Sequence, residues 1–100
     1  MNTTPTTDAA TLRDLLRAAL AGQLDHPLTP ADDEVSLADL VADRYDSLGV
    51  LDAVGLVERD FGVSVDLVVD DLRSTFFSVA SIAALVERKR RDEAVLGMLS

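Results

Sequence analysis

Residues 44–63, RYDSLGVLDAVGLVERDFGV, carry a complete helix signal with a start, an apolar repeat and a stop. Asp46 and Ser47 are of the residue types that cap helix N-termini, and Gly62 is of the type that ends helices. The stretch therefore predicts a helix over residues 47–61.

The apolar repeat fixes which face of this helix is buried. At about 100° per residue, one narrow arc holds the residues expected to face the core: Val50, Ala53, Val54, Val57 and Phe61. The opposite arc holds Leu48, Asp52, Gly55 and Arg59, and Gly49 is also expected to point outward. A single exposed leucine is ordinary, but Leu48 follows Ser47 at a helix start, which indicates a docking contact beside an exposed hydroxyl. Free N–H groups at the start of a helix also favour a phosphate.

The segments before this helix predict another helix and a long connection. A helix over residues 8–24 is indicated by apolar residues at helical spacing, namely Leu12, Leu15, Leu16, Ala19 and Leu20. Its polar side is expected to hold Arg13, Asp14 and Arg17. Residues 25–45 contain two prolines and form a connection with one helical turn at SLADL. Its apolar anchors are Leu28, Val35, Leu37, Leu40 and Val41, which we expect to hold it down.

The segments after residue 63 predict a short helix and a long one. The short helix is expected near residues 67–73, with Phe76 and Phe77 in the next turn. The long helix begins near Ser78 and extends through residues 87–93. Its inward residues are expected to be Val79, Ile82, Ala83 and Val86. The fold class predicted is therefore all-α, a four-helix bundle with a short third helix and a long loop between the first two helices.

Composition bounds the class of protein. The chain has 100 residues, which predicts one domain over residues 1–100, with flexible ends at 1–7 and about 92–100. It has 18 acidic and 9 basic residues, a net charge of −9, which argues against nucleic acid and favours partners with basic patches. It has no cysteine, so disulfides and thiolate metal sites are excluded. The N-terminus lacks the pattern of a signal peptide, and no apolar stretch is long enough to span a membrane, so a cytoplasmic protein is expected. We also expect a monomer.

Other kinds of site are disfavoured by the residues themselves. A serine hydrolase needs a base, and the only histidine, His26, lies in a proline-flanked loop as an ordinary loop residue. The sequence DSLGV also lacks the Gly-x-Ser-x-Gly elbow. The acidic pairs Asp32-Asp33 and Asp70-Asp71 lack the spacing of a calcium loop and are interpreted as solvated charge. We therefore expect no catalytic residue and no metal site, and the Asp46-Ser47 pair retains the simpler interpretation of a helix cap.

The sequence resembles the acyl carrier protein family over about residues 10–88. The resemblance is carried by DSL at a helix start, then FGVSV, then a short helix and FFSVASIAALV. It implies that Ser47, flanked by Asp46 and Leu48, receives 4'-phosphopantetheine from coenzyme A. It further implies that the thiol of this arm holds an acyl group as a thioester, so that the chain is a carrier and not an enzyme. The partners implied are a phosphopantetheinyl transferase and the enzymes that load, transfer or condense the acyl group.

The implied docking surface lies on the same helix. Its expected residues are Leu48, Leu51, Asp52, Gly55, Glu58 and Arg59. Arg59 interrupts the acidic stripe seen in fatty-acid carriers, and two glycines stand on the same helix, so the sequence is more similar to discrete carriers of bacterial polyketide or nonribosomal-peptide pathways. A peptidyl carrier that holds an amino acid and a helical adaptor without a prosthetic arm remain as alternatives.

Overall fold

The computed structural model describes residues 9–67 and 71–99, and for Ala9 and residues 94–99 it describes the backbone alone. The part of the chain so described is all-α: it contains helices and no strand, as the sequence predicts. The elements are α1 (Ala9–Leu24), the 3-10 turn η1 (Pro30–Asp32), α2 (Leu37–Leu40), α3 (Ser47–Phe61), α4 (Leu72–Thr75) and α5 (Val79–Leu99). None of the helices so described has the length and apolar character needed to cross a membrane.

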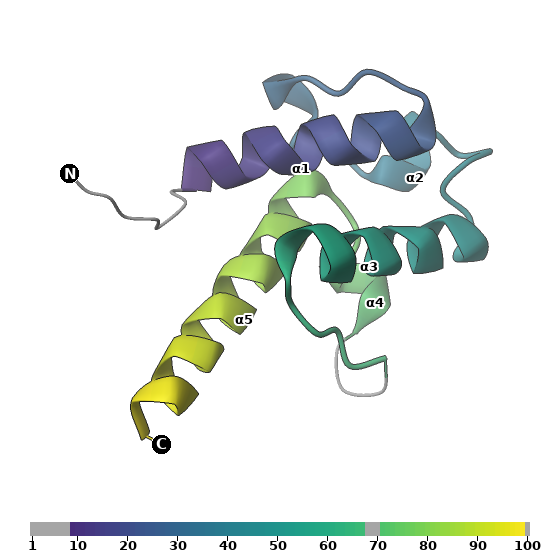
Figure 1. Cartoon of the computed structure of the whole chain (residues 1–100). Helices are drawn as coiled ribbons and strands as arrows, with labels where there is room; N and C mark the ends of the chain where they lie inside the picture. Colours follow the sequence, from purple (N-terminus) through teal and green to yellow (C-terminus); the bar gives the residue numbers. More distant parts are fainter. Residues whose placement is uncertain (1–8, 68–70, 100) are drawn as a thin grey trace.

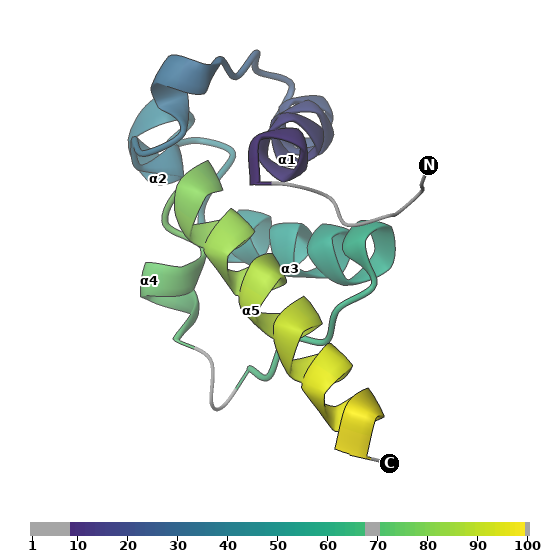
Figure 2. The same ribbon diagram turned by 90° about the vertical axis from the view of Figure 1, so that its left-hand side faces the viewer.

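The longer helices pack around one aliphatic core. Helix α1 contacts both α3 and α5, and the short α4 contacts the start of α5. Figure 1 shows α1 and α3 one above the other with α5 running obliquely away from both, and Figure 2 shows α2 and α4 on the same side of the molecule. The largest fully buried side chains are Leu12, Leu16, Leu20, Leu37, Val57, Phe76, Val79, Ile82, Leu85 and Val86.

Helix α1 has a narrower buried stripe than the sequence predicts. Leu12, Leu16 and Leu20 are buried and Ala19 packs against them, but the prediction that Leu15 faces the core is wrong. Leu15 is 51% exposed because the core accepts a strict four-residue repeat that continues to Leu24, and Leu15 lies beside that repeat.

The long connection is fastened by a buried ion pair, so the prediction that Asp32-Asp33 is solvated charge is wrong for Asp33. The Asp33 residue is 6% exposed, and its carboxylate accepts hydrogen bonds from Arg17 Nε at 2.6 Å and Arg17 Nη2 at 3.3 Å. Arg17 is therefore not on the solvent side of α1. The carbonyl oxygen of Asp33 accepts the Ala80 N–H at 2.8 Å, so this residue links α1 to α5. Its neighbour Asp32 binds the Thr29 N–H at 2.9 Å.

Most of the predicted anchors of this connection are confirmed. Leu37 and Val41 are buried, Leu28 and Leu40 pack against the core, and SLADL forms α2 with Ser36 as its cap. The exception is Val35, which is 38% exposed because the chain there follows the tight turn that brings Asp33 inward.

The predicted bounds of α3 are confirmed, and those of the short helix are wrong. Gly62 adopts φ 67° and ends α3, where its N–H donates to the Glu58 carbonyl at 3.1 Å. Helix α4 begins at Leu72 instead of near residue 67, because Asp71 caps it through the Arg73 N–H at 3.1 Å. The part of the prediction over residues 68–70, including Asp70, lies outside the described residues.

Helix α5 begins where the sequence predicts. The Ser78 hydroxyl accepts the Ser81 N–H at 3.2 Å, which is the hydrogen bond of a helix cap. The predicted inward residues Val79, Ile82, Ala83 and Val86 are all buried. The helix continues through residues 92–99, while Ser100 and residues 1–8 lie outside the described part of the chain.

Candidate functional site

At the start of α3, the residue that caps the helix and the residue with an exposed hydroxyl are two different residues. Asp46 is the cap: its Oδ1 accepts the Gly49 N–H at 3.0 Å. Ser47 is the first residue of the helix and is exposed. The structure gives its hydroxyl no hydrogen bond to any residue that it describes. The serine is thus not needed as the cap, and its oxygen is available to another molecule.

A close approach of the backbone fixes this helix start in space. The prediction that Gly49 points outward is wrong, because Gly49 is buried. A Cβ atom at this position would collide with the Arg44 carbonyl oxygen and would lie 3.1 Å from its carbonyl carbon. Glycine therefore allows the end of the connection to cross the first turn of α3, which places Tyr45, Asp46 and Ser47.

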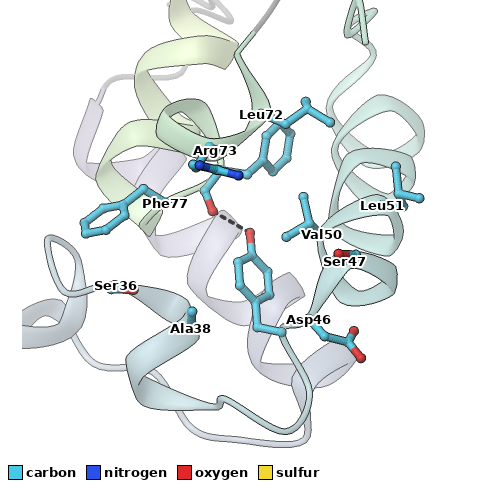
Figure 3. Close-up of a pocket in the computed structure, with 11 residues that line it drawn as sticks. Ser36, Ala38, Asp46, Ser47, Val50, Leu51, Leu72, Arg73 and Phe77 are labelled. Atoms are coloured by element: carbon cyan, nitrogen blue, oxygen red, sulfur yellow. Dashed lines mark hydrogen bonds between the residues drawn. The ribbon is translucent and has the colours of Figure 1, made fainter.

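A pocket of about 630 Å³ opens beside the Ser47 hydroxyl (Figure 3). Its walls come from the α2 region, from the first turns of α3, and from α4 and the turn that follows it. The lining residues are Ser36, Ala38, Tyr45, Asp46, Ser47, Val50, Leu51, Leu72, Arg73, Phe76 and Phe77. Most of these side chains are apolar, so the pocket suits an apolar group better than a strongly hydrated one.

The phenol of Tyr45 connects two sides of this pocket. The ring is buried, and its hydroxyl donates to the Phe76 carbonyl at 2.6 Å, the dashed line in Figure 3. Burial raises the pKa of the Tyr45 hydroxyl, because the phenolate would lose its hydration. This group is therefore a neutral structural donor and not an acid or base near neutral pH.

The remaining polar groups of the pocket differ in whether they are already engaged. The Ser36 hydroxyl accepts the Asp39 N–H at 3.3 Å, and the Asp46 carboxylate binds the Gly49 N–H. The Arg73 guanidinium has no hydrogen bond or ion pair to the residues that the structure describes, and Arg73 is exposed. Among the described lining residues, Arg73 is thus the cationic side chain, and its guanidinium donors are unused.

The predicted docking residues lie on α3 outside the pocket or at its edge. Leu48 is 71% exposed and Leu51 is 48% exposed, as a docking surface requires, and Asp52, Gly55 and Arg59 are also exposed. Two of the charged residues have partners within the chain. The Glu58 carboxylate accepts the Val65 N–H at 2.9 Å, and Arg59 pairs with Asp60 at 3.2 Å. The apolar pair is therefore more available to another protein than these two charges are.

Several pocket residues were not predicted from the sequence. Tyr45, Arg73 and Ser36 come from three separate segments, and no local pattern brings them together. The one usable signal is the Phe76-Phe77 pair, for which the sequence predicts only a turn after the short helix. In the structure Phe76 is buried and Phe77 is half exposed.

His26 and the acidic residues form no site of their own. The His26 N–H donates to the Ala21 carbonyl at 3.2 Å in the turn after α1, and the side chain is partly exposed. Among the residues described, no group of three or more potential metal ligands lies close enough to hold an ion. No protein-family model, no curated protein and no solved structure matches this chain.

Proposed function

We propose that this protein is an acyl carrier protein that bears 4'-phosphopantetheine on Ser47. The observation that carries the proposal is the free, exposed Ser47 hydroxyl at the start of α3. Asp46 caps this helix, and an apolar pocket opens beside the hydroxyl. In the modification, the Ser47 hydroxyl loses its proton and its Oγ bonds to a phosphorus atom of coenzyme A. The bond from that phosphorus to the adenosine bisphosphate half breaks, and that half leaves.

The residues around Ser47 fit a phosphate-linked arm. The N–H groups of Ser47 and Leu48 belong to the first turn of α3, where backbone donors have no partner within a helix. The Asp46 carboxylate would repel a phosphate, but it is bound to the Gly49 N–H and points away from the pocket in Figure 3. The positive end of the helix then favours the phosphate.

The remaining parts of the site have roles that follow from their exposure. When bound, the arm would supply a thiol that holds an acyl group as a thioester. Tyr45, Val50 and Phe76 would shield the apolar part of the arm or its cargo from water. Leu48 and Leu51 would contact the transferase and the enzymes that use the acyl group, and the net charge of −9 would attract basic patches on those partners.

The arrangement of helices also supports this proposal. If α2 is counted as a turn within the long connection, α1, α3, α4 and α5 correspond to a bundle whose third helix is short. That is the architecture implied by the resemblance to carrier proteins. We propose a discrete carrier of a specialised acyl group, with a peptidyl carrier as the alternative cargo class.

A helical adaptor without an arm is the competing function. The exposed leucines Leu48 and Leu51 would serve an adaptor equally well. An adaptor, however, has no use for a free hydroxyl beside an apolar pocket, so the two functions differ at Ser47.

The test is an intact-mass measurement. The unmodified chain is incubated with coenzyme A and a broadly active phosphopantetheinyl transferase, and we expect a mass gain of one phosphopantetheine. Ser47→Ala should gain no mass, while the control Ser64→Ala, which removes another exposed hydroxyl, should load normally. Ser47→Ala should also keep its stability, because the cap is Asp46. By contrast, Asp46→Ala should lose about 0.5–2 kcal/mol. A wild-type chain that gains no mass would favour the adaptor, and loading that persists in Ser47→Ala would exclude Ser47 as the attachment point.

A further inference from the structure

The lining of the pocket beside Ser47 includes a positively charged side chain, Arg73, which has no role in the attachment of an arm to Ser47. Arg73 lies on α4, on a different helix from Ser47, and its guanidinium has no partner among the described residues (Figure 3). The neighbouring walls are the apolar side chains of Leu72, Phe76 and Phe77. An unused set of guanidinium donors next to an apolar surface is suited to a ligand with an apolar body and an anionic end.

The chemistry of the guanidinium indicates which anionic group the ligand carries. Its planar fork of N–H donors matches the two oxygens of a carboxylate, and such pairs are shorter and stronger than neutral hydrogen bonds. Among the described lining residues, the other charged side chain is Asp46, which is bound to the Gly49 N–H and directed away from the pocket. A carboxylate could therefore approach Arg73 along the apolar wall without meeting a free acid among these described residues.

We infer that this pocket takes an apolar group that ends in a carboxylate, and that Arg73 binds the carboxylate. The same chemistry has two sources: a free acid from solution, or an acyl group with a terminal carboxylate tethered to Ser47. The second source rests on the proposed function, and the first does not. Arg73 would then distinguish acidic cargo from neutral cargo of the same length.

The free acid is tested on the unmodified chain. Octanoate and octanamide are titrated separately while NMR shifts of Tyr45, Val50 and Phe76 are followed. We expect saturable shifts with both, and tighter binding of octanoate. Arg73→Gln should weaken octanoate binding about fivefold, the effect of an ion pair worth about 1 kcal/mol, and should leave octanamide binding unchanged. Arg91→Gln removes the same charge from an exposed position on α5 outside the pocket and should change neither.

The tethered acid is tested on chains loaded from octanoyl-coenzyme A or suberoyl-coenzyme A, with loading verified by mass. Suberoyl adds a terminal carboxylate to the same chain length. We expect a higher melting temperature for the suberoyl form than for the octanoyl form in wild type and in Arg91→Gln, and no difference in Arg73→Gln. A response to either source supports the inference and identifies which source applies. If neither source responds to Arg73→Gln, the inference is overturned, even where the mass measurement shows that Ser47 is loaded.

Discussion

Replacing each of two glycines in α3 by alanine should change stability in opposite directions. Alanine is favoured over glycine inside a helix by about 1 kcal/mol. Gly55 is exposed and nothing lies within 4 Å of a Cβ added there, so Gly55→Ala should gain most of that amount. At Gly49 the new Cβ meets the backbone carbonyl of Arg44, which cannot rotate away as a side chain can. Overpacking of a buried site costs about 1–3 kcal/mol. With the upper value and the propensity gain subtracted, Gly49→Ala should lose about 2 kcal/mol.

Thermal denaturation followed by circular dichroism measures both effects. For a domain of this size, 1 kcal/mol shifts the melting temperature by about 4–8 °C. Gly55→Ala should therefore melt a few degrees above wild type, and Gly49→Ala about ten degrees below it. Because Gly49 also places Ser47, Gly49→Ala should slow loading by the transferase, whereas any slowing in Gly55→Ala would reflect docking alone. If Gly49→Ala is as stabilising as Gly55→Ala, the crossing of Arg44 over the first turn of α3 is not as described.

Three further predictions concern the core, the exposed leucine and the buried phenol. Phe61→Ala should cost about 3–5 kcal/mol in a denaturant titration, whereas Arg59→Ala should cost less than about 0.5 kcal/mol; equal losses would mean that the face of α3 is misassigned. Leu48→Glu should leave melting unchanged and slow modification by the transferase; modification at the normal rate would exclude Leu48 from that interface. The folded pKa of Tyr45 is raised above 10.0, so the folded chain keeps a proton that the unfolded chain loses. Stability should therefore fall as pH rises above about 10, and Tyr45→Phe should remove that part of the fall. Tyr45 is the only tyrosine, so the absorbance of its phenolate reports the titration directly, and phenolate formation near pH 10 in the folded chain would contradict its burial.

The helices with local signals at both ends were predictable from the sequence. Helix α3 has Asp46 before it and Gly62 after it, and its predicted bounds agree with the structure. The short helix had no such pair of signals near residue 67, so its position followed from apolar residues alone, whereas the cap at Asp71 decides where it begins. Helix ends are set by hydrogen bonds to unpaired backbone groups, and a sequence shows them only where the capping residue is distinctive.

Interactions between distant segments were not predictable in the same way. Asp33 has the sequence context of a solvated acid, but Arg17 of α1 reaches it across the fold and the pair becomes buried. Leu15 satisfies the helical repeat but lies beside the core. The periodic pattern predicts an outward Gly49 because it describes the helix alone, whereas the chain that buries Gly49 comes from the preceding connection. For Asp33 and Gly49 the decisive neighbour belongs to another element.

The candidate site also has a part that one helix predicts and a part that depends on packing between segments. The free serine and the exposed leucine beside it follow from the phase of one helix, so Ser47 and Leu48 were available to sequence reasoning. The pocket requires three segments to converge, and the presence of Arg73 at its edge follows only from their packing. The sequence could therefore indicate where an arm would attach, but it could not indicate what chemistry the adjacent pocket would accept.

The long connection is the element that makes this pocket preformed. Its residues are joined by hydrogen bonds at three points to residues 76–80, which run from the end of α4 into the first turn of α5. These are the Leu37 N–H to the Phe77 carbonyl at 2.9 Å, the Ala80 N–H to the Asp33 carbonyl at 2.8 Å, and the Tyr45 hydroxyl to the Phe76 carbonyl at 2.6 Å. The walls on either side of the pocket are thus fastened to one short stretch of backbone. A group that enters does not have to order these walls, so less of its binding free energy is lost to ordering them. A loop of this length without its own core is usually functional or held by its own contacts, and here the contacts that hold it are the ones that shape the pocket.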